Sequence, residues 1–364
     1  MILRRAAASV ATAVVIVVGL PTVARADSVR DRQWHLQFLN IAAAQQISQG
    51  NGVVVAVTDS GVDPRSPELQ AAVVPGLTNG GGETGDGRQD VNGHGTSMAS
   101  LIAARGKGGN DGALGIAPKA TIMPIRVQLG ALMADPAYLG PGIDWAVDHG
   151  AKVISISAGS SEEPTTKTAI ERALAKDVVV VAAVGNTTDT TTVAFPAKLP
   201  GVLAVAGVDR QGNHASISAA GPETVLSAPA VDIVSIGLDS RYMTSSGTSN
   251  ATAIVAGAVA LVRAKYPQLS GPEVVRRLTY TAQDKGEPGR DPVYGYGVVD
   301  PLKALTAEVP PAPSTTSPQP STSPETSSGG GRQVAAIAAI SAAAVVMVFI
   351  SVLQTIIRSR RRRG

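Results

Sequence analysis

The sequence contains no cysteine. It therefore has no disulfide bond, no thiolate ligand for zinc or an iron–sulfur cluster, and no cysteine nucleophile. Aromatic residues are also scarce, at 3% of the chain, which disfavours a carbohydrate- or cell-wall-binding module because such sites use exposed aromatic rings. An exported form of this chain would have to rely on its packed core for stability.

Histidine is nearly as rare, because only four occur: His35, His94, His149 and His214. The sequence has no H-E-x-x-H pattern, so a zinc protease of that class is not expected. His149 stands before a glycine at an expected helix end, which is typical of a helix-capping residue. His35 and His214 have no evident partner in the sequence.

Positive charge is concentrated at the two ends of the chain. Nine of the 31 Lys and Arg lie within residues 1–26 or after Gly331, whereas all 28 Asp and Glu lie between these segments. The intervening body is therefore acidic, although the isoelectric point of the whole chain is about 9.2. A nucleic-acid partner is not expected, because the basic surface that binds phosphates is missing.

The N-terminus has the three parts of a signal peptide. Arg4 and Arg5 precede an apolar stretch that ends at Leu20, and small residues, Ala24 and Ala26, flank the expected cleavage site. Residues 1–26 are therefore predicted to be a secretory signal. An N-terminal membrane anchor is the alternative, and the short apolar run disfavours it.

The C-terminus predicts a membrane anchor. Residues 309–331 are rich in Pro, Ser and Thr, which is typical of an extended spacer. Residues 332–357 then contain an uncharged run of about 24 residues, long enough for a helix to cross a bilayer. The basic residues 358–364 follow, and the positive-inside rule places them in the cytoplasm. A single-pass protein of the cell membrane with its body outside the cell is expected.

The body, residues 27–308, alternates between strand-like and helix-like segments. Strands are expected at 53–58, 121–127, 153–157, 178–183, 202–206 and 231–236, and helices at 96–104, 142–149, 166–176, 249–265 and 272–282. The strand segments are continuously apolar, which favours strands that are buried on both faces. The predicted fold class is α/β, with a mostly parallel central sheet and helices on both faces. Residues that directly follow the strands are then the candidates for a ligand site.

Three short polar motifs stand at a strand end or a helix start, and each has an ordinary structural explanation. Asp59 ends the first strand in the sequence TDSG, where an aspartate often only stabilises a turn. His94 lies between two glycines at the start of an apolar helix, where the helix dipole disfavours an imidazolium unless a carboxylate is near. Ser249, in GTSNA, also precedes an apolar helix and has the features of a plain N-cap.

Two further strand ends favour a shared site. Asn186 follows a buried strand, and its side-chain amide is a suitable donor to a developing oxyanion. Ser157, Ala158 and Gly159 follow another strand, where a bare backbone edge is suited to pair with an extended peptide. One common function explains these five features more simply than five separate structural roles.

These residues together resemble the subtilisin-like serine proteases, or subtilases, over about residues 34–304. The order Asp, His, Ser along the chain is that of subtilisin. The resemblance implies that Asp59, His94 and Ser249 form a catalytic triad, with Asn186 as the oxyanion donor and Ser157–Gly159 as the substrate-pairing segment. It also implies a protein or peptide substrate and no required cofactor.

The order of segments along the chain is similar to that of the mycosins, actinobacterial subtilases linked to type VII secretion, so secretion components are expected partners. The sequence departs from the subtilase pattern at two positions. Asn250 replaces a residue that is usually apolar, and Ala253 replaces the usual proline. The lead before the first strand leaves no room for the folding prodomain of secreted subtilisins, and the cysteine pairs common in mycosins are missing.

Two alternatives follow from these observations. Subtilases often bind calcium, and Glu83, Asp86 and Asp90 gather in the loop 80–93, although a solvated loop explains them better. The departures at Asn250 and Ala253 also leave room for a weakly active or inactive subtilase-fold scaffold of a secretion complex. The leading prediction is a membrane-anchored extracellular serine endopeptidase that acts through an acyl-enzyme.

Overall fold

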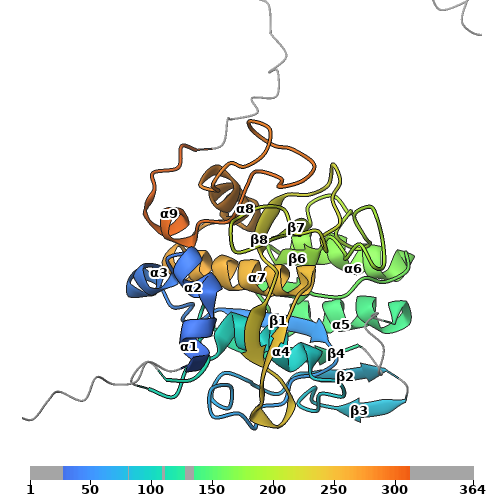
Figure 1. The fold of residues 1–364 in the computed structure, drawn as a ribbon. Helices are drawn as coiled ribbons and strands as arrows, with labels where there is room; N and C mark the ends of the chain where they lie inside the picture. The colour runs from blue at the N-terminus through green and yellow to red at the C-terminus, as the bar shows by residue number, and fades with distance from the viewer. Residues whose placement is uncertain (1–27, 81, 109–110, 128–134, 312–364) are drawn as a thin grey trace, which may run out of the picture. The chain divides into compact units, whose positions relative to one another are not determined.

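Five of the six predicted strands lie in one sheet in the computed structural model, which describes residues 28–80, 82–108, 111–127 and 135–311. Within these residues the sheet has eight strands in the order β3-β2-β4-β1-β5-β6-β7-β8 (Figure 1). All neighbouring pairs are parallel except β2 and β3. The strands are β1 (Val54–Asp59), β2 (Leu77–Gly80), β3 (Glu83–Gly85), β4 (Thr121–Arg126), β5 (Val153–Ile156), β6 (Val179–Ala183), β7 (Leu203–Val208) and β8 (Leu226–Pro229).

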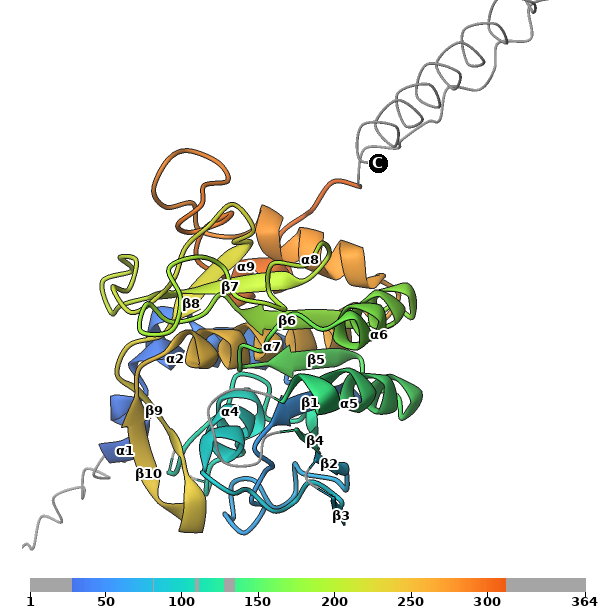
Figure 2. The same cartoon turned by 90° about the vertical axis from the view of Figure 1, so that its right-hand side faces the viewer.

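Helices cover both faces of this sheet, as expected for strands that are apolar throughout. Figure 2 shows α4 (His94–Ala103) and α7 (Thr248–Lys265) on one side, and α5 (Pro136–Asp148) and α6 (Pro164–Ala175) on the other. The alternation of side chains along β1 separates the two cores: Val55 packs in the cluster that contains α4 and α7, whereas Ala56 packs in the one that contains α5 and α6.

The sequence did not predict the helices of the lead segment. Three short helices, α1 (Ser28–Arg32), α2 (Trp34–Phe38) and α3 (Ile41–Ile47), precede β1. The lead is tied to the body, because the indole of Trp34 donates a hydrogen bond to the Val231 carbonyl at 3.1 Å. Two later helices, α8 (Gly271–Tyr280) and α9 (Pro301–Thr306), complete the described part of the chain.

The predicted strand 231–236 does not belong to the central sheet. The apolar segment 231–236 forms β9 (Ile233–Ile236), which pairs antiparallel with β10 (Tyr242–Ser245) in a separate ribbon. The edge of the central sheet is instead β8, whose Leu226 lies opposite Val205. Both segments are fully buried, so the apolar pattern cannot tell which of them pairs with β7.

The chain reverses its direction of travel across the sheet at β1. The chain leaves β1 toward β2, on the side of β4, and leaves β5, the other neighbour of β1, toward β6 and the opposite edge. Crevices form beyond the carboxyl ends of strands at such a point. Asp59 is the last residue of β1 and therefore lies at this position.

The predicted signal peptide 1–26, the membrane helix 332–357 and the tail 358–364 lie outside the described residues, as does most of the spacer. Within the described ranges, no helix is long and apolar enough to span a membrane.

Candidate active site

Asp59 is fully buried and makes its principal contact with His94. Its two carboxylate oxygens lie 2.8 and 2.9 Å from Nδ1 of the imidazole. The backbone N–H of Ser60 also donates to Asp59 Oδ1, at 2.8 Å. These bonds hold the carboxylate in one orientation and leave Nε2 as the ring nitrogen of His94 that is free to face other groups.

The sequence around His94 allows its helix to begin close to β1. Gly93 is the N-cap of α4 in a left-handed conformation (φ 87°), and Asn92 Oδ1 accepts the backbone N–H of His94 at 2.9 Å. Gly95 follows, and a Cβ atom there would lie only 2.0 Å from the Gly61 carbonyl oxygen. The two glycines that flank His94 therefore serve a turn and a close backbone approach.

The surroundings of His94 favour its charged form. Burial of the ring acts to lower the pKa of His94, but the charge of Asp59, the hydrogen bond that His94 donates to Asp59 and the charge of Asp90 outweigh it, so the pKa is raised above its ordinary value. Asp59 and Asp90 therefore stabilise the imidazolium that forms when His94 accepts a proton.

Asp90 was predicted only as a calcium candidate, and the structure gives it a different position. It accepts hydrogen bonds from Ser60 Oγ at 2.7 Å, from the Gly93 N–H at 2.9 Å and from the Thr96 N–H at 2.9 Å. It thus joins the turn after β1 to the first turn of α4. A local signal existed, since an acidic residue that precedes a helix start commonly caps it.

The three acidic residues of the proposed calcium loop have separate partners. Glu83 forms an ion pair with Arg126 at 2.9 Å, and Asp86 forms one with Arg88. Asp90 is directed toward α4, as described above. In the part of the chain that the structure describes, no group of three or more carboxylate or histidine side chains is arranged to hold a metal ion.

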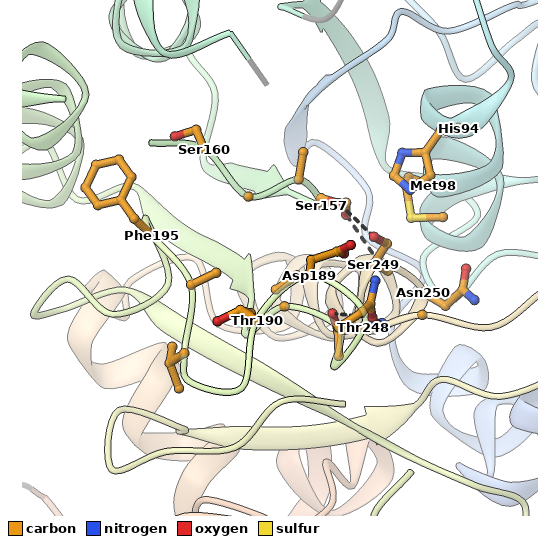
Figure 3. A pocket seen from close by; sticks show the side chains of 18 of the residues that line it. His94, Met98, Ser157, Ser160, Asp189, Thr190, Phe195, Thr248, Ser249 and Asn250 are labelled. Carbon is orange, nitrogen blue, oxygen red and sulfur yellow. Dashed lines mark hydrogen bonds between the residues drawn. The ribbon is translucent and has the colours of Figure 1, made fainter. Parts of the chain in front are cut away.

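Ser249 is the second residue of α7 rather than its N-cap. The N-cap is Gly247, so the prediction that Ser249 caps the helix is corrected by two positions. Its hydroxyl donates a hydrogen bond to the Ser157 carbonyl at 2.7 Å (Figure 3). Among the described residues, the Ser249 hydroxyl has no hydrogen bond to His94.

Asn186 is anchored by its side-chain oxygen. Oδ1 accepts the backbone N–H of Thr248 at 3.0 Å and the Thr248 hydroxyl at 3.2 Å. The Asn186 side chain therefore reaches from the loop after β6 to the start of α7. The amide nitrogen is therefore left to donate to another group.

One cavity of about 710 Å³ brings most of the predicted site residues together. Its lining includes His94, Ser249 and Asn186 together with Ser157, Ala158 and Gly159 (Figure 3). Asp59 is behind His94 and does not line the cavity.

The two departures at the start of α7 are accommodated in the packing. The Asn250 side chain is buried, and its amide donates to the Ser245 carbonyl at 3.1 Å and to the Ser245 hydroxyl at 3.2 Å. Ala253 is fully buried inside the helix. Asn250 thus ties α7 to the end of β10, and it also lines the cavity beside Ser249.

The other histidines lie outside this cavity. His149 is the C-cap residue of α5, as predicted, and its ring stacks on Trp145 with 3.6 Å between ring centroids. His35 is fully buried in α2, and burial lowers its pKa to about 3. His214 is partly buried, and burial also lowers its pKa.

The chain is similar to several known proteins over most of its length. The family model described as "Subtilase family" matches residues 50–297. A thermostable alkaline protease of Halalkalibacterium halodurans is 37% identical over 268 residues, which cover 73% of this chain and 71% of that protein. Mycosin-3 of Mycobacterium tuberculosis is 34% identical over 76% of this chain and 72% of its own. The solved structure of the protease MycP3 from the type VII (ESX-3) secretion system covers 76% of this chain and 88% of its own at 34% identity, with a TM-score of 0.66.

Proposed function

The chain belongs to the subtilase family and is a subtilisin-like serine endopeptidase, and on that premise we propose that Asp59, His94 and Ser249 are its catalytic triad. The observation that carries this assignment is the pair of contacts, at 2.8 and 2.9 Å, between the buried Asp59 carboxylate and His94 Nδ1, beside a cavity that His94 and Ser249 both line.

Each residue has a defined role in peptide hydrolysis. Ser249 Oγ attacks the peptide carbonyl carbon while His94 Nε2 accepts the hydroxyl proton. His94 then gives this proton to the leaving amine, so the C–N bond breaks and an acyl-enzyme remains. Water, deprotonated by the same histidine, hydrolyses the ester. Asp59 holds the ring in the tautomer with Nδ1 protonated and stabilises the imidazolium that forms.

The tetrahedral intermediate needs donors for its negative oxygen. We assign this role to the amide of Asn186 and the backbone N–H of Ser249, which has no intrahelical acceptor because it lies in the first turn of α7. Such donors act where charge develops in the transition state. The segment Ser157–Gly159, at the end of β5, is proposed to pair with the extended backbone of the substrate.

Labelling by a fluorophosphonate probe tests the triad. Wild-type chain should react at Ser249 and hydrolyse a peptide substrate, and Ser249→Ala should lose both activities. Ser160→Ala is the matched control, because Ser160 lines the same cavity and should remain dispensable for labelling. Unchanged hydrolysis by Ser249→Ala would refute the assignment.

We also propose that the protease is anchored in the cell membrane by residues 332–357, with its body outside the cell. The support is the apolar stretch, the basic residues after it and the signal-like N-terminus. The lack of cysteine offers a direct test, since a single engineered thiol is the only one in the chain. In intact cells an impermeant maleimide should label Ser317→Cys, but label Gly364→Cys only after the membrane is opened.

A role in type VII secretion is the last part of the proposal. It is supported by the similarity to Mycosin-3 and to MycP3. In the source organism, removal of the chain should lower export of type VII substrates. Replacement of the native chain by its Ser249→Ala variant then distinguishes a proteolytic contribution from a structural one.

A further inference from the structure

The cavity beside Ser249 has two walls that come from neighbouring parallel strands. The segment 157–160 continues from β5, and the loop from Gly185 to Phe195 continues from β6. The walls are joined, because the Ser160 N–H donates to the Phe195 carbonyl at 3.1 Å. Apolar side chains line part of this space, among them Ala183, Val193 and Phe195.

This space is suited to one particular substrate side chain. If the attacked carbonyl lies between Ser249 Oγ and the amide of Asn186, the residue that carries it lies next to both walls. Its side chain is then the one that enters between them, because the substrate backbone follows the 157–159 edge. The lining of the walls therefore selects the residue on the acyl side of the cleaved bond.

Leaving His94 aside, the charged side chains that line the cavity carry one net negative charge. Besides His94, the charged side chains in the lining are Glu162, Asp189 and Lys198. Glu162 and Lys198 form an ion pair and neutralise each other. Among the described residues, the Asp189 carboxylate has no ion pair or hydrogen bond, so one negative charge remains.

The backbone holds Asp189 in place near Asn186. The Asn186 carbonyl accepts the N–H groups of Asp189 and Thr190, both at 2.9 Å, which closes a tight turn. This turn holds Asp189 next to Asn186, the residue that we assign as oxyanion donor. The Asp189 side chain is exposed at the rim of the cavity. Figure 3 shows Asp189 and Thr190 on the loop of this wall.

We infer that Asp189 is a specificity-determining residue that favours substrates with Lys or Arg on the acyl side of the cleaved bond. This inference rests on the proposed function of Ser249 and Asn186. The stem of a long basic side chain packs against the apolar wall, and its cationic end reaches the carboxylate at the rim. The pairing lies close to solvent, so salt weakens it.

The test uses peptides that are identical except for Arg, Leu or Glu at this position, and it measures kcat/KM with the full-length protein. Arg should be preferred over Leu, and Glu should be the poorest. Asp189→Asn should lower the Arg-to-Leu ratio about tenfold at low ionic strength, and less at high ionic strength. Lys198→Met, which frees Glu162, should raise the same ratio.

Glu287→Gln is the matched control, because it removes one exposed carboxylate that does not line the cavity. Its Arg-to-Leu ratio should equal that of the wild type. Ser249-dependent cleavage with no preference for Arg, or an equal change in Asp189→Asn and Glu287→Gln, would overturn the inference and leave the proposed function standing. Cleavage of none of the peptides would contradict both.

Discussion

The hydroxyl of Ser249 donates its hydrogen bond to the carbonyl of Ser157, at 2.7 Å, and not to His94. The two residues are 92 positions apart in the sequence, and they meet because the ends of β5 and the start of α7 face the same cavity. Attack on a substrate requires this bond to break. A rotation about χ1 of Ser249 is sufficient, since staggered rotamers are the alternatives available to a serine hydroxyl.

A covalent phosphonate adduct should therefore contain a rotated Ser249 side chain and an unmoved backbone. Its crystal structure is expected to show Oγ bonded to phosphorus, the Ser157 carbonyl released, and α7 beginning at the same residue. Displacement of the first turn of α7 in the adduct would show that more than a rotamer change is needed.

The pH dependence of kcat/KM should be sensitive to the charge of Asp90. His94 acts as a base only when neutral, so kcat/KM falls as the pH drops below the pKa of His94. Because Asp59 and Asp90 favour the imidazolium, that pKa is raised. Asp90→Asn removes a negative charge near the ring, so the acid limb of the pH profile should move to lower pH.

Asp86→Asn is the control for this experiment. Asp86 lies in the same loop, but it is paired with Arg88 and does not contribute to the pKa of His94. Its acid limb should match that of the wild type. Equal shifts in both variants would mean that the effect arises from the loop as a whole.

Asn186→Ala should lower kcat roughly 10²- to 10³-fold and change KM little, because its amide is proposed to act only when the oxyanion forms. Steady-state kinetics with one peptide substrate measure both constants. Thr248→Val, which removes only one of the two donors to Asn186 Oδ1, should have a much smaller effect. A rise in KM alone in Asn186→Ala would point to a binding role instead.

Asn250→Ala should lower the free energy of unfolding by about 1–3 kcal/mol, because a buried side chain is truncated and the partly buried acceptors on Ser245 lose their donor. The midpoint of urea unfolding measures this change. Residual kcat/KM of the folded variant should stay close to that of the wild type, since Asn250 is directed toward β10. A large loss of kcat at full stability would show that Asn250 positions Ser249.

The buried His35 should lower the free energy of unfolding of the protein at acidic pH. Its buried ring has a pKa lowered from 6.5 to about 3, so below pH 6.5 the unfolded chain takes up a proton that the folded chain does not. Stability is then lost as the pH falls from 6.5 to about 3, and the loss reaches about 2 kcal/mol at pH 5.

His35→Leu should remove this part of the pH dependence. Within the described structure neither ring nitrogen of His35 has a hydrogen-bond partner, so the replacement breaks no such bond. Urea unfolding at about pH 7.5 and about pH 5, in a Ser249→Ala background that prevents self-cleavage, measures the slope. Equal slopes with and without His35 would contradict the prediction.

Much of the fold was predictable because its signals are local. The continuous apolar runs located β1, β4, β5, β6 and β7 to within two residues at most of their ends, and the helices α4, α6, α7 and α8 were placed similarly well. The start of α5 was missed by six residues, since Pro136 begins it and a second proline lies inside it. The pairing of 231–236 depended on long-range contacts and was assigned to the wrong sheet.

The sequence by itself determined which residue types carry the chemistry and where they stand: Asp59 after a strand, and His94 and Ser249 near helix starts. These positions follow from local hydrogen bonding and apolar periodicity, which extend over a few residues. Only the tertiary structure decided that Asp59 and His94 are in contact, that the Ser249 hydroxyl is bonded to Ser157, and that Asp189 is the unbalanced charge of the cavity. Those relationships depend on how parallel strands and their crossover helices converge at one edge of the sheet, and no local pattern specifies that geometry.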